Sequence, residues 1–131
     1  MPAQYYRDET RIHRVAYQLA WTPARRKPVL TETIVDDCRR LIQQRCEARG
    51  WNILKLDIRP DHVHLIVQVW PINSAAEVVK ECKNATSHEL RAKYTHLKKM
   101  PSLWTRAYFA ATIGEPSPDA IARFVEIQSK Q

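Results

Sequence analysis

The sequence predicts an α+β fold in which a four-stranded antiparallel sheet carries two helices on one face. Three observations lead to this prediction. Four short segments are typical of strands, two longer segments have the helical spacing of apolar residues, and the six follow in the order β-α-β-β-α-β. That order is the split βαβ arrangement of the ferredoxin-like and RRM-like folds, followed here by one C-terminal helix. The length of 131 residues fits a single domain, 1–131.

The first third of the chain predicts a strand, a loop and a helix. Residues 13–21 alternate as a strand does, with Val15, Tyr17, Leu19 and Trp21 on one face. Residues 22–28 contain two prolines and a basic run, which predicts a loop. Residues 32–49 predict a helix that ends at Gly50, a residue type that favours a left-handed cap. Its apolar stripe consists of Ile34, Val35, Cys38, Leu41, Ile42 and Cys46.

Two strands are expected next. Residues 51–58 predict one of them, although the neighbours Ile53 and Leu54 break its alternation. Residues 62–70 alternate most clearly, because Val63, Leu65, Val67 and Val69 point one way while the intervening side chains point the other. These intervening side chains are His62, His64, Ile66, Gln68 and Trp70.

The last part of the chain predicts a helix, a loop, a strand and a short final helix. Asn73 or Ser74 caps the first of these helices, which is expected to reach about Tyr94. Residues 95–103 predict a basic loop, and residues 105–113 a fourth strand that is rich in aromatic side chains. Ser117 and Pro118 then have the types favoured at the start of a helix, which continues to the C-terminus.

Composition excludes several classes of protein. With 44% apolar and 27% charged residues the chain is neither fibrous nor disordered. No apolar run approaches the ~20 residues that span a bilayer. Residues 1–10 lack the apolar stretch of a secretion signal, so we expect a cytoplasmic protein with no membrane partner. The cysteines are spaced like helix positions, which favours buried thiols over a disulfide framework or zinc ribbon: Cys38, Cys46 and Cys82.

The charge balance indicates a polyanionic partner. Lys and Arg total 21 against 14 acidic residues, which gives a net charge of +7 and a pI near 9.6. A small domain this basic is typical of nucleic-acid binding, although a solubilising surface gives the same number.

His62 and His64 are the sharpest candidates for chemistry. Two residues at i and i+2 on a strand project from the same face with Cα atoms roughly 6.5–7 Å apart, so that two imidazoles can converge on one metal ion. They lie opposite the apolar row of their strand. The alternative is two surface histidines on an exposed strand.

The residues around this pair resemble a known family. The string Pro60-Asp61-His62-Val63-His64 is similar to the His-hydrophobe-His motif of the HUH endonuclease superfamily. The wider chain resembles the single-tyrosine HUH transposases of the smallest insertion sequences, those of the IS200-like type. This resemblance extends from Leu19-Ala20-Trp21 and Arg25-Arg26, through residues 103–109, to the terminal helix at residues 121–128.

The resemblance implies a DNA transposase that acts on single-stranded DNA with hairpins near the element's ends. In that family a tyrosine on the terminal helix attacks a backbone phosphate and leaves a 5′-phosphotyrosine. A divalent ion, Mg²⁺ or Mn²⁺, is held by the two histidines and by a glutamine, here His62, His64 and Gln128. Asp61 either orients an imidazole or merely turns the chain. Homodimers and a bacterial or archaeal host are implied as well.

The nucleophile itself is missing. Phe124 stands where the family has its tyrosine, four residues before Gln128 and hence on the same helical face. The chain is therefore expected to be inactive in forming the covalent intermediate. Three explanations are open: an engineered change, a natural loss, or a shifted alignment in which another tyrosine serves. Phe124 can also be an ordinary core aromatic, which is compatible with a lost nucleophile. The other tyrosines are Tyr5, Tyr6, Tyr17, Tyr94 and Tyr108, and none of them has a glutamine at plus four.

Several basic and aromatic residues are candidates for DNA contact. The basic candidates follow the first strand, lie on the second helix, or precede the fourth strand: Arg25, Arg26, Lys27, Lys80, Lys83, Arg91 and Arg106. Trp21, Trp70, Trp104 and Tyr108 could stack unpaired bases or pack in the core.

Two other functions remain open from the sequence. One is a non-catalytic hairpin-DNA-binding protein derived from such a transposase. The other is an RRM-like RNA binder, which the missing ribonucleoprotein aromatic motif disfavours.

Overall fold

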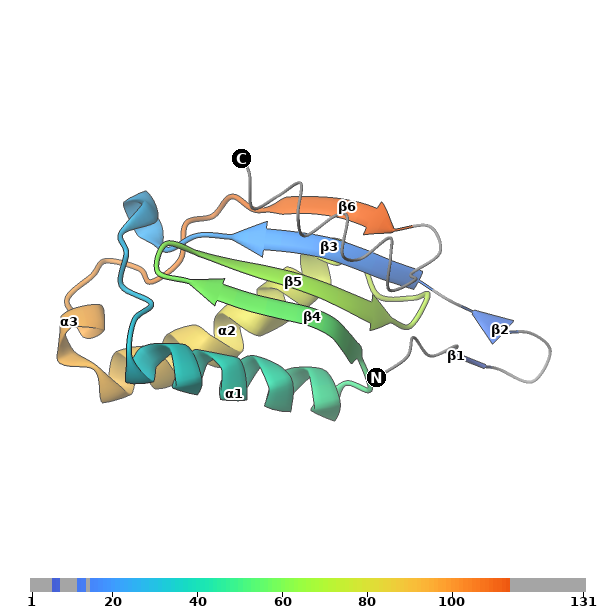
Figure 1. Ribbon diagram of the computed structural model, residues 1–131, viewed down its shortest axis with the longest axis horizontal. Coiled ribbons are helices and arrows are strands. Elements are labelled where there is room, and N and C mark those ends of the chain that lie inside the picture. Colours follow the sequence, from blue (N-terminus) through green and yellow to red (C-terminus); the bar gives the residue numbers. More distant parts are fainter. Residues whose placement is uncertain (1–5, 8–11, 14, 114–131) are drawn as a thin grey trace.

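A four-stranded antiparallel sheet organises the chain, in a computed structural model that describes residues 6–7, 12–13 and 15–113 (Figure 1). The strand order is β4-β5-β3-β6. The bounds of these strands are β3 Val15–Trp21, β4 Asn52–Arg59, β5 His62–Val69 and β6 Phe109–Ile113. The sheet and its connections confirm the predicted ferredoxin-like arrangement.

Helices α1 (Thr33–Ala48) and α2 (Ala75–Lys93) lie together on one side of this sheet (Figure 1). The smaller elements are a 3-10 turn η1 (Ala24–Arg26), a single-turn helix α3 (Thr95–Lys98), and a separate pair of two-residue strands, β1 (Tyr6–Arg7) and β2 (Ile12–His13). The predicted terminal helix lies outside the described residues.

The alternation along the central strands separates two faces. Val63, Leu65 and Val67 of β5 belong to the main core between the sheet and the two helices. Ile66 points the other way and joins a small second cluster with Ala16 and Ile113. Burial of the main cluster provides the larger apolar contribution to folding, at roughly 25 cal/mol per Å².

The broken alternation at Ile53 and Leu54 corresponds to a β-bulge in β4. The register pairs Ile53 with Val67 and Lys55 with Ile66, so Leu54 is the extra residue. Such an insertion keeps Leu56 and Ile58 on the core side although the sequence pattern shifts by one.

Both predicted helices end near their predicted positions. Ser74 caps α2, because its hydroxyl accepts a hydrogen bond from the backbone N–H of Glu77 at 3.1 Å. Gly50 follows α1 with φ of 74°, the left-handed conformation that the sequence predicts there.

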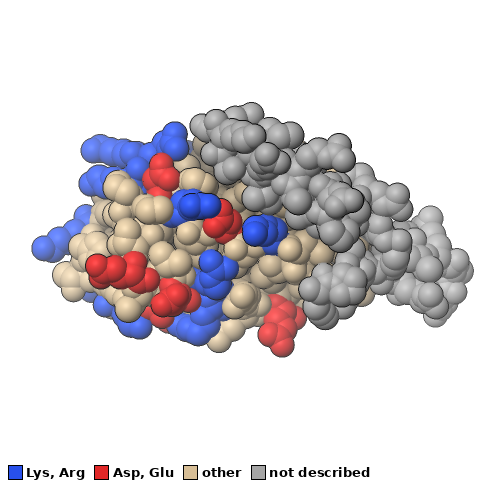
Figure 2. All heavy atoms as spheres, viewed as in Figure 1, with Lys and Arg blue, Asp and Glu red and all other residues tan. Residues whose placement is uncertain are grey.

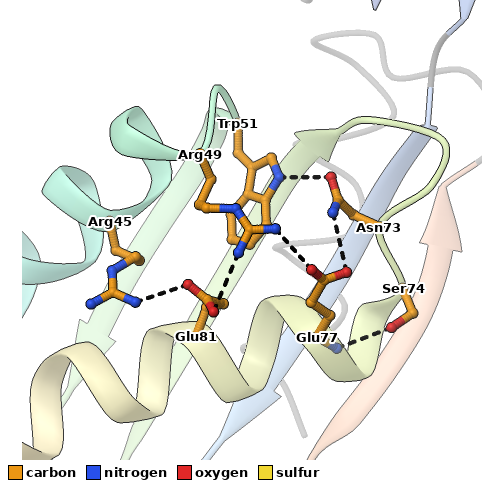
Figure 3. A network of polar contacts seen from close by, with 7 residues as sticks. All are labelled: Arg45, Arg49, Trp51, Asn73, Ser74, Glu77 and Glu81. Atoms are coloured by element: carbon orange, nitrogen blue, oxygen red, sulfur yellow. Dashed lines mark hydrogen bonds and ion pairs between the residues drawn. The ribbon is translucent and has the colours of Figure 1, made fainter.

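A polar network joins the end of α1 to the start of α2 (Figure 3). Arg49 donates to Glu77 at 2.8 Å and lies 3.3 Å from Glu81, and Arg45 donates to Glu81 at 2.8 Å. Asn73 connects the network to the sheet, since its side-chain oxygen accepts from the indole of Trp51 at 2.9 Å. These contacts join α1 to α2 outside the apolar core.

Two predicted boundaries are wrong. The expected loop at 95–103 begins with α3, which Leu97 anchors in the core. The expected strand at 105–113 begins only at Phe109. The reason is that the carbonyls of Thr105, Arg106 and Ala107 face the ammonium of Lys83, at 2.7, 3.4 and 3.5 Å, instead of a neighbouring strand.

Two expectations from composition can be compared with the described residues. Cys38, Cys46 and Cys82 are free and buried, as predicted. Within the described part of the chain, no helix combines the length and apolarity needed to cross a bilayer.

Gly50→Ala should lower the free energy of unfolding by about 1–2 kcal/mol, because a side chain in the left-handed region is strained. The added Cβ would also lie 3.1 Å from Nε1 of Trp70. Urea denaturation measures the effect. Gln44→Ala, at an exposed position of α1, is the control and should change stability by less than about 0.5 kcal/mol. An unchanged Gly50→Ala midpoint would contradict the argument.

Candidate metal and nucleic-acid site

The two histidines of β5 lie on the face of the sheet that is opposite the helices. In the register, His62 pairs with Arg59 of β4, and His64 pairs with Asp57 of β4 and Ala20 of β3. His62 therefore stands at the end of the sheet beside the β4–β5 turn, and His64 lies further inside. Their shared face is the arrangement that two ligands of one ion require.

His62 is oriented by its neighbour Asp61. The Nδ1–H group of His62 donates to Oδ1 of Asp61 at 2.9 Å, and Arg26 donates to the other carboxylate oxygen at 3.1 Å. The hydrogen bond from His62 is the main cause of a lowered Asp61 pKa. With Nδ1 engaged, the nitrogen of His62 that stays available for a ligand is Nε2.

His64 is buried, with 5% of its surface exposed, so the alternative of two surface histidines is wrong for this residue. Burial lowers its pKa, against an opposing effect of the Asp57 charge. The ring is therefore neutral at physiological pH, which is the form that binds metals. Its Nε2 lies 3.0 Å from the side-chain nitrogen of Gln18, a residue with no exposed surface.

These two imidazoles fit part of a divalent metal site. One ring is neutral by burial and the other is held by a carboxylate, as metal-binding histidines commonly are. Among the described residues, no group of three His, Cys, Asp or Glu side chains could hold an ion. A third protein ligand would thus be of another type or come from elsewhere. Phe124 and Gln128 both lie outside the described residues.

Sequence reasoning missed two neighbours of His64, namely Gln18 and Asp57. Each is a polar residue between two core side chains of its strand, so alternation alone places it on the histidine face. Knowing that they flank His64 also requires the register of three strands, which one sequence does not supply.

The tyrosines that the structure describes with side chains are all engaged on the helix side. Tyr17 donates to the backbone oxygen of Asn73 at 2.9 Å, and Tyr94 donates to Asp37 at 2.5 Å. Tyr108 lies next to Phe109, which faces the histidine side, and its ring contacts Lys83 of α2 at 5.8 Å. None of these three hydroxyls therefore shares a face with His62 and His64.

An open basic groove runs along the outer side of α2. Its largest part has a volume of about 670 Å³ and is lined by Asn84, Ser87, His88, Arg91, Ala92 and Lys98. Two adjoining hollows of about 220 and 300 Å³ share Lys83, Asn84 and Arg106, and the smaller one also includes Lys80 and Tyr108.

Two of the predicted DNA contacts in this groove also hold the protein together. Lys83 binds the backbone carbonyls before β6, and its burial lowers its pKa. Arg91 donates to the carbonyl of Met100 at 2.7 Å and so fixes the segment after α3. Lys80 and Arg106 are exposed and face the groove without such bonds to described residues.

The remaining basic candidates lie on η1 or directly after it, at the end of the sheet that carries His62. Arg25, Arg26 and Lys27 are exposed, and the first two have left-handed φ angles of 59° and 53°. Figure 2 shows Lys and Arg side chains gathered toward this end of the molecule, at the left of the view.

The aromatic candidates divide into two groups. Trp21 and Trp104 are buried and pack edge to face with ring centroids 6.2 Å apart, so base stacking is excluded for them. Trp70 and Tyr108 are exposed by 39% and 42% and stay candidates.

Comparison with known proteins identifies a matching family and several similar proteins. The family described as "Transposase IS200 like" matches residues 11–128. The ISDra2 transposase TnpA of Deinococcus radiodurans is 24% identical over 98% of this chain and 94% of its own. A crystal structure from D. radiodurans R1 assigned to the transposases has a TM-score of 0.76 and 24% identity, covering 94% of this chain and 97% of its own.

A second solved structure is more distant. The REP-associated tyrosine transposase bound to a REP hairpin has a TM-score of 0.60 at 18% identity, and the match covers 89% of this chain and 68% of the other. At 24% and 18% identity, the similarity to these two structures shows that this chain has the same fold.

Tyr94→Phe should cost about 1 kcal/mol at neutral pH, because the Asp37 charge loses a hydrogen bond. That bond is the main cause of the lowered Asp37 pKa. The stability it contributes is present above the ordinary aspartate pKa, near 3.8, and is lost as the pH falls through the lower folded value. Urea unfolding at pH 7 and at pH 2–3 should show the two proteins converge in acid. A constant difference would contradict this.

Proposed function

This chain belongs to the family of IS200-like transposases, and from that premise we propose that it binds single-stranded DNA hairpins through a single domain and positions a phosphodiester at His62 and His64. The family supports a role in transposition. The hairpin-bound relative supports DNA of this kind as the partner. Because Phe124 has no hydroxyl group, we propose that the chain as written binds its DNA without forming a 5′-phosphotyrosine.

The observation that carries this proposal is the pair of histidines on one face, each with a single engaged nitrogen. Asp61 binds Nδ1 of His62, and Gln18 contacts Nε2 of His64. Both rings retain one nitrogen with no hydrogen bond to a described residue, which is what a bound cation requires.

The chemistry follows from charge. Attack on a phosphodiester builds negative charge on the phosphate oxygens, and a bound Mg²⁺ or Mn²⁺ supplies the Lewis acid that neutralises it. His62 and His64 would hold that ion, and the amide of Gln128 would complete the set. Arg26 is exposed, lies 3.1 Å from Asp61 and would bind a phosphate oxygen. A phenylalanine at position 124 has no hydroxyl group, so this side chain has no proton for a base to remove and no oxygen to attack the phosphate.

A second candidate function is a non-catalytic protein that binds hairpin DNA and has lost the whole site for DNA cleavage. What favours it is that Tyr17 and Tyr94 are engaged in structural hydrogen bonds, and that Tyr108 lies on the helix side with them. Restoring the hydroxyl at position 124 distinguishes the two, because only a retained catalytic site responds.

We propose further that the chain works as a homodimer. Support comes from β6, which is an edge strand of the described sheet and exposes Phe109, Ala110 and Thr112. An open strand edge is a template for pairing with a second chain.

Phe124→Tyr should form a covalent protein–DNA adduct with single-stranded oligonucleotides that carry the hairpins flanking the gene, in the presence of Mn²⁺ or Mg²⁺. Denaturing electrophoresis detects the adduct. The chain as written, with phenylalanine at 124, is the matched control and should give none. His64→Ala in the Phe124→Tyr background should reduce adduct formation by 100-fold or more. No adduct on any native end would overturn the proposed catalytic site.

Arg106→Ala and Lys80→Ala should each weaken hairpin binding and lower the slope of log K against log salt by about 1, if each neutralises one phosphate. Fluorescence anisotropy over a salt series measures both quantities. Arg40→Ala, at an exposed site of α1, removes the same charge outside the groove and should leave the slope unchanged. Equal effects from all three variants would show a general charge effect and contradict a role for the groove.

A further inference from the structure

Gln18 and His64 contact each other on the sheet face opposite α1 and α2, and both side chains are buried. Gln18 has no exposed surface and His64 has 5%. The side-chain nitrogen of Gln18 lies 3.0 Å from Nε2 of His64, and the carboxamide oxygen has no hydrogen-bond partner. Burying a carboxamide with one unsatisfied atom lowers stability, so stability alone does not account for Gln18.

The register shows from which side Gln18 reaches the ring. Gln18 pairs with Ile66, two residues beyond His64 in the direction away from His62. The nitrogen of His64 that contacts Gln18 is therefore held on the side away from His62. The other nitrogen, Nδ1, forms no hydrogen bond with a described residue and is left for a ligand shared with His62.

The carboxamide can make this contact in two ways. Its N–H can donate to a bare Nε2, in which case the ring proton is on Nδ1. With the amide turned over, its oxygen accepts from Nε2–H, and Nδ1 then carries a lone pair. A cation can bind at Nδ1 only in the second arrangement, since a neutral imidazole has one bare nitrogen.

We propose that Gln18 is a positioning residue of the metal site, which holds Nε2–H of His64 with its carboxamide oxygen so that His64 binds a divalent ion through Nδ1 while His62 binds through Nε2. This inference rests on the proposed function. Asp61 and Gln18 then do the same task for different nitrogens, one from a turn and the other from a neighbouring strand. The proposed ion would thus lie between Nδ1 of His64 and Nε2 of His62.

Long-range ¹H–¹⁵N spectra of the full-length protein labelled with ¹⁵N-histidine test the proposal directly. Signals are assigned by their loss in His62→Asn and His64→Asn. Zn²⁺ is the probe, because it is diamagnetic and binds imidazole. On titration we expect the Nδ1 resonance of His64 and the Nε2 resonance of His62 to move, while Nε2 of His64 keeps its proton. Zn²⁺ on Nε2 of His64 would overturn the role of Gln18 and leave the metal site standing. No response at either histidine would overturn the metal site and this inference together.

Variants give an independent measurement. Gln18→Leu should weaken Mn²⁺ binding by 10- to 100-fold, as loss of a histidine's hydrogen-bond partner commonly does. Gln68→Leu, the same change at a buried glutamine of the same face, should alter it by less than twofold. Gln18→Glu, whose carboxylate can only accept, should retain Mn²⁺ affinity and the Nε2–H tautomer. Mn²⁺ electron paramagnetic resonance reads the affinity. Equal losses in the two leucine variants would contradict a specific role for Gln18.

Discussion

The two-residue alternation of β5 is the constraint on which the rest of the structure depends. Its odd positions are apolar and hold α1 and α2 against the sheet, so its even positions must face the other way. A register slip by one residue would expose the core row and bury both histidines under the helices. Stability and chemistry are therefore fixed by the same hydrogen-bonded ladder, and neither can shift without the other.

The sequence was sufficient for much of this architecture because its strongest signals are local. The helix stripes, the Ser74 cap, Gly50 and the β5 alternation each predict an element within a few residues, and even the irregularity at Leu54 is visible as a broken pattern. The late start of β6 was not predictable, because Lys83 of α2 competes for the carbonyls before it. Gln18 and Asp57 were missed for the same reason, since only pairing between distant strands brings them beside His64.

Some basic side chains of α2 and its surroundings bind backbone carbonyls, and others face the groove. The sequence does not show which residue does which. Lys83 and Arg91 donate hydrogen bonds to backbone carbonyls of the segment between α2 and β6. Lys80 and Arg106 instead face the groove beside them. The half-buried ammonium of Lys83 binds the carbonyls before β6, so this segment without regular structure can pass close to α2. The shape of the groove thus depends on cations inside it as well as on those at its surface.

The extra residue in β4 makes the two borders of the sheet unequal. A bulge increases local twist and disrupts the regular row of backbone groups that a foreign strand would need, so that border is protected from pairing. The opposite border, at β6, has no register shift along its pairing with β3. The homodimer proposed above would therefore pair through β6 and close about a two-fold axis, whereas pairing at both borders would propagate into fibres.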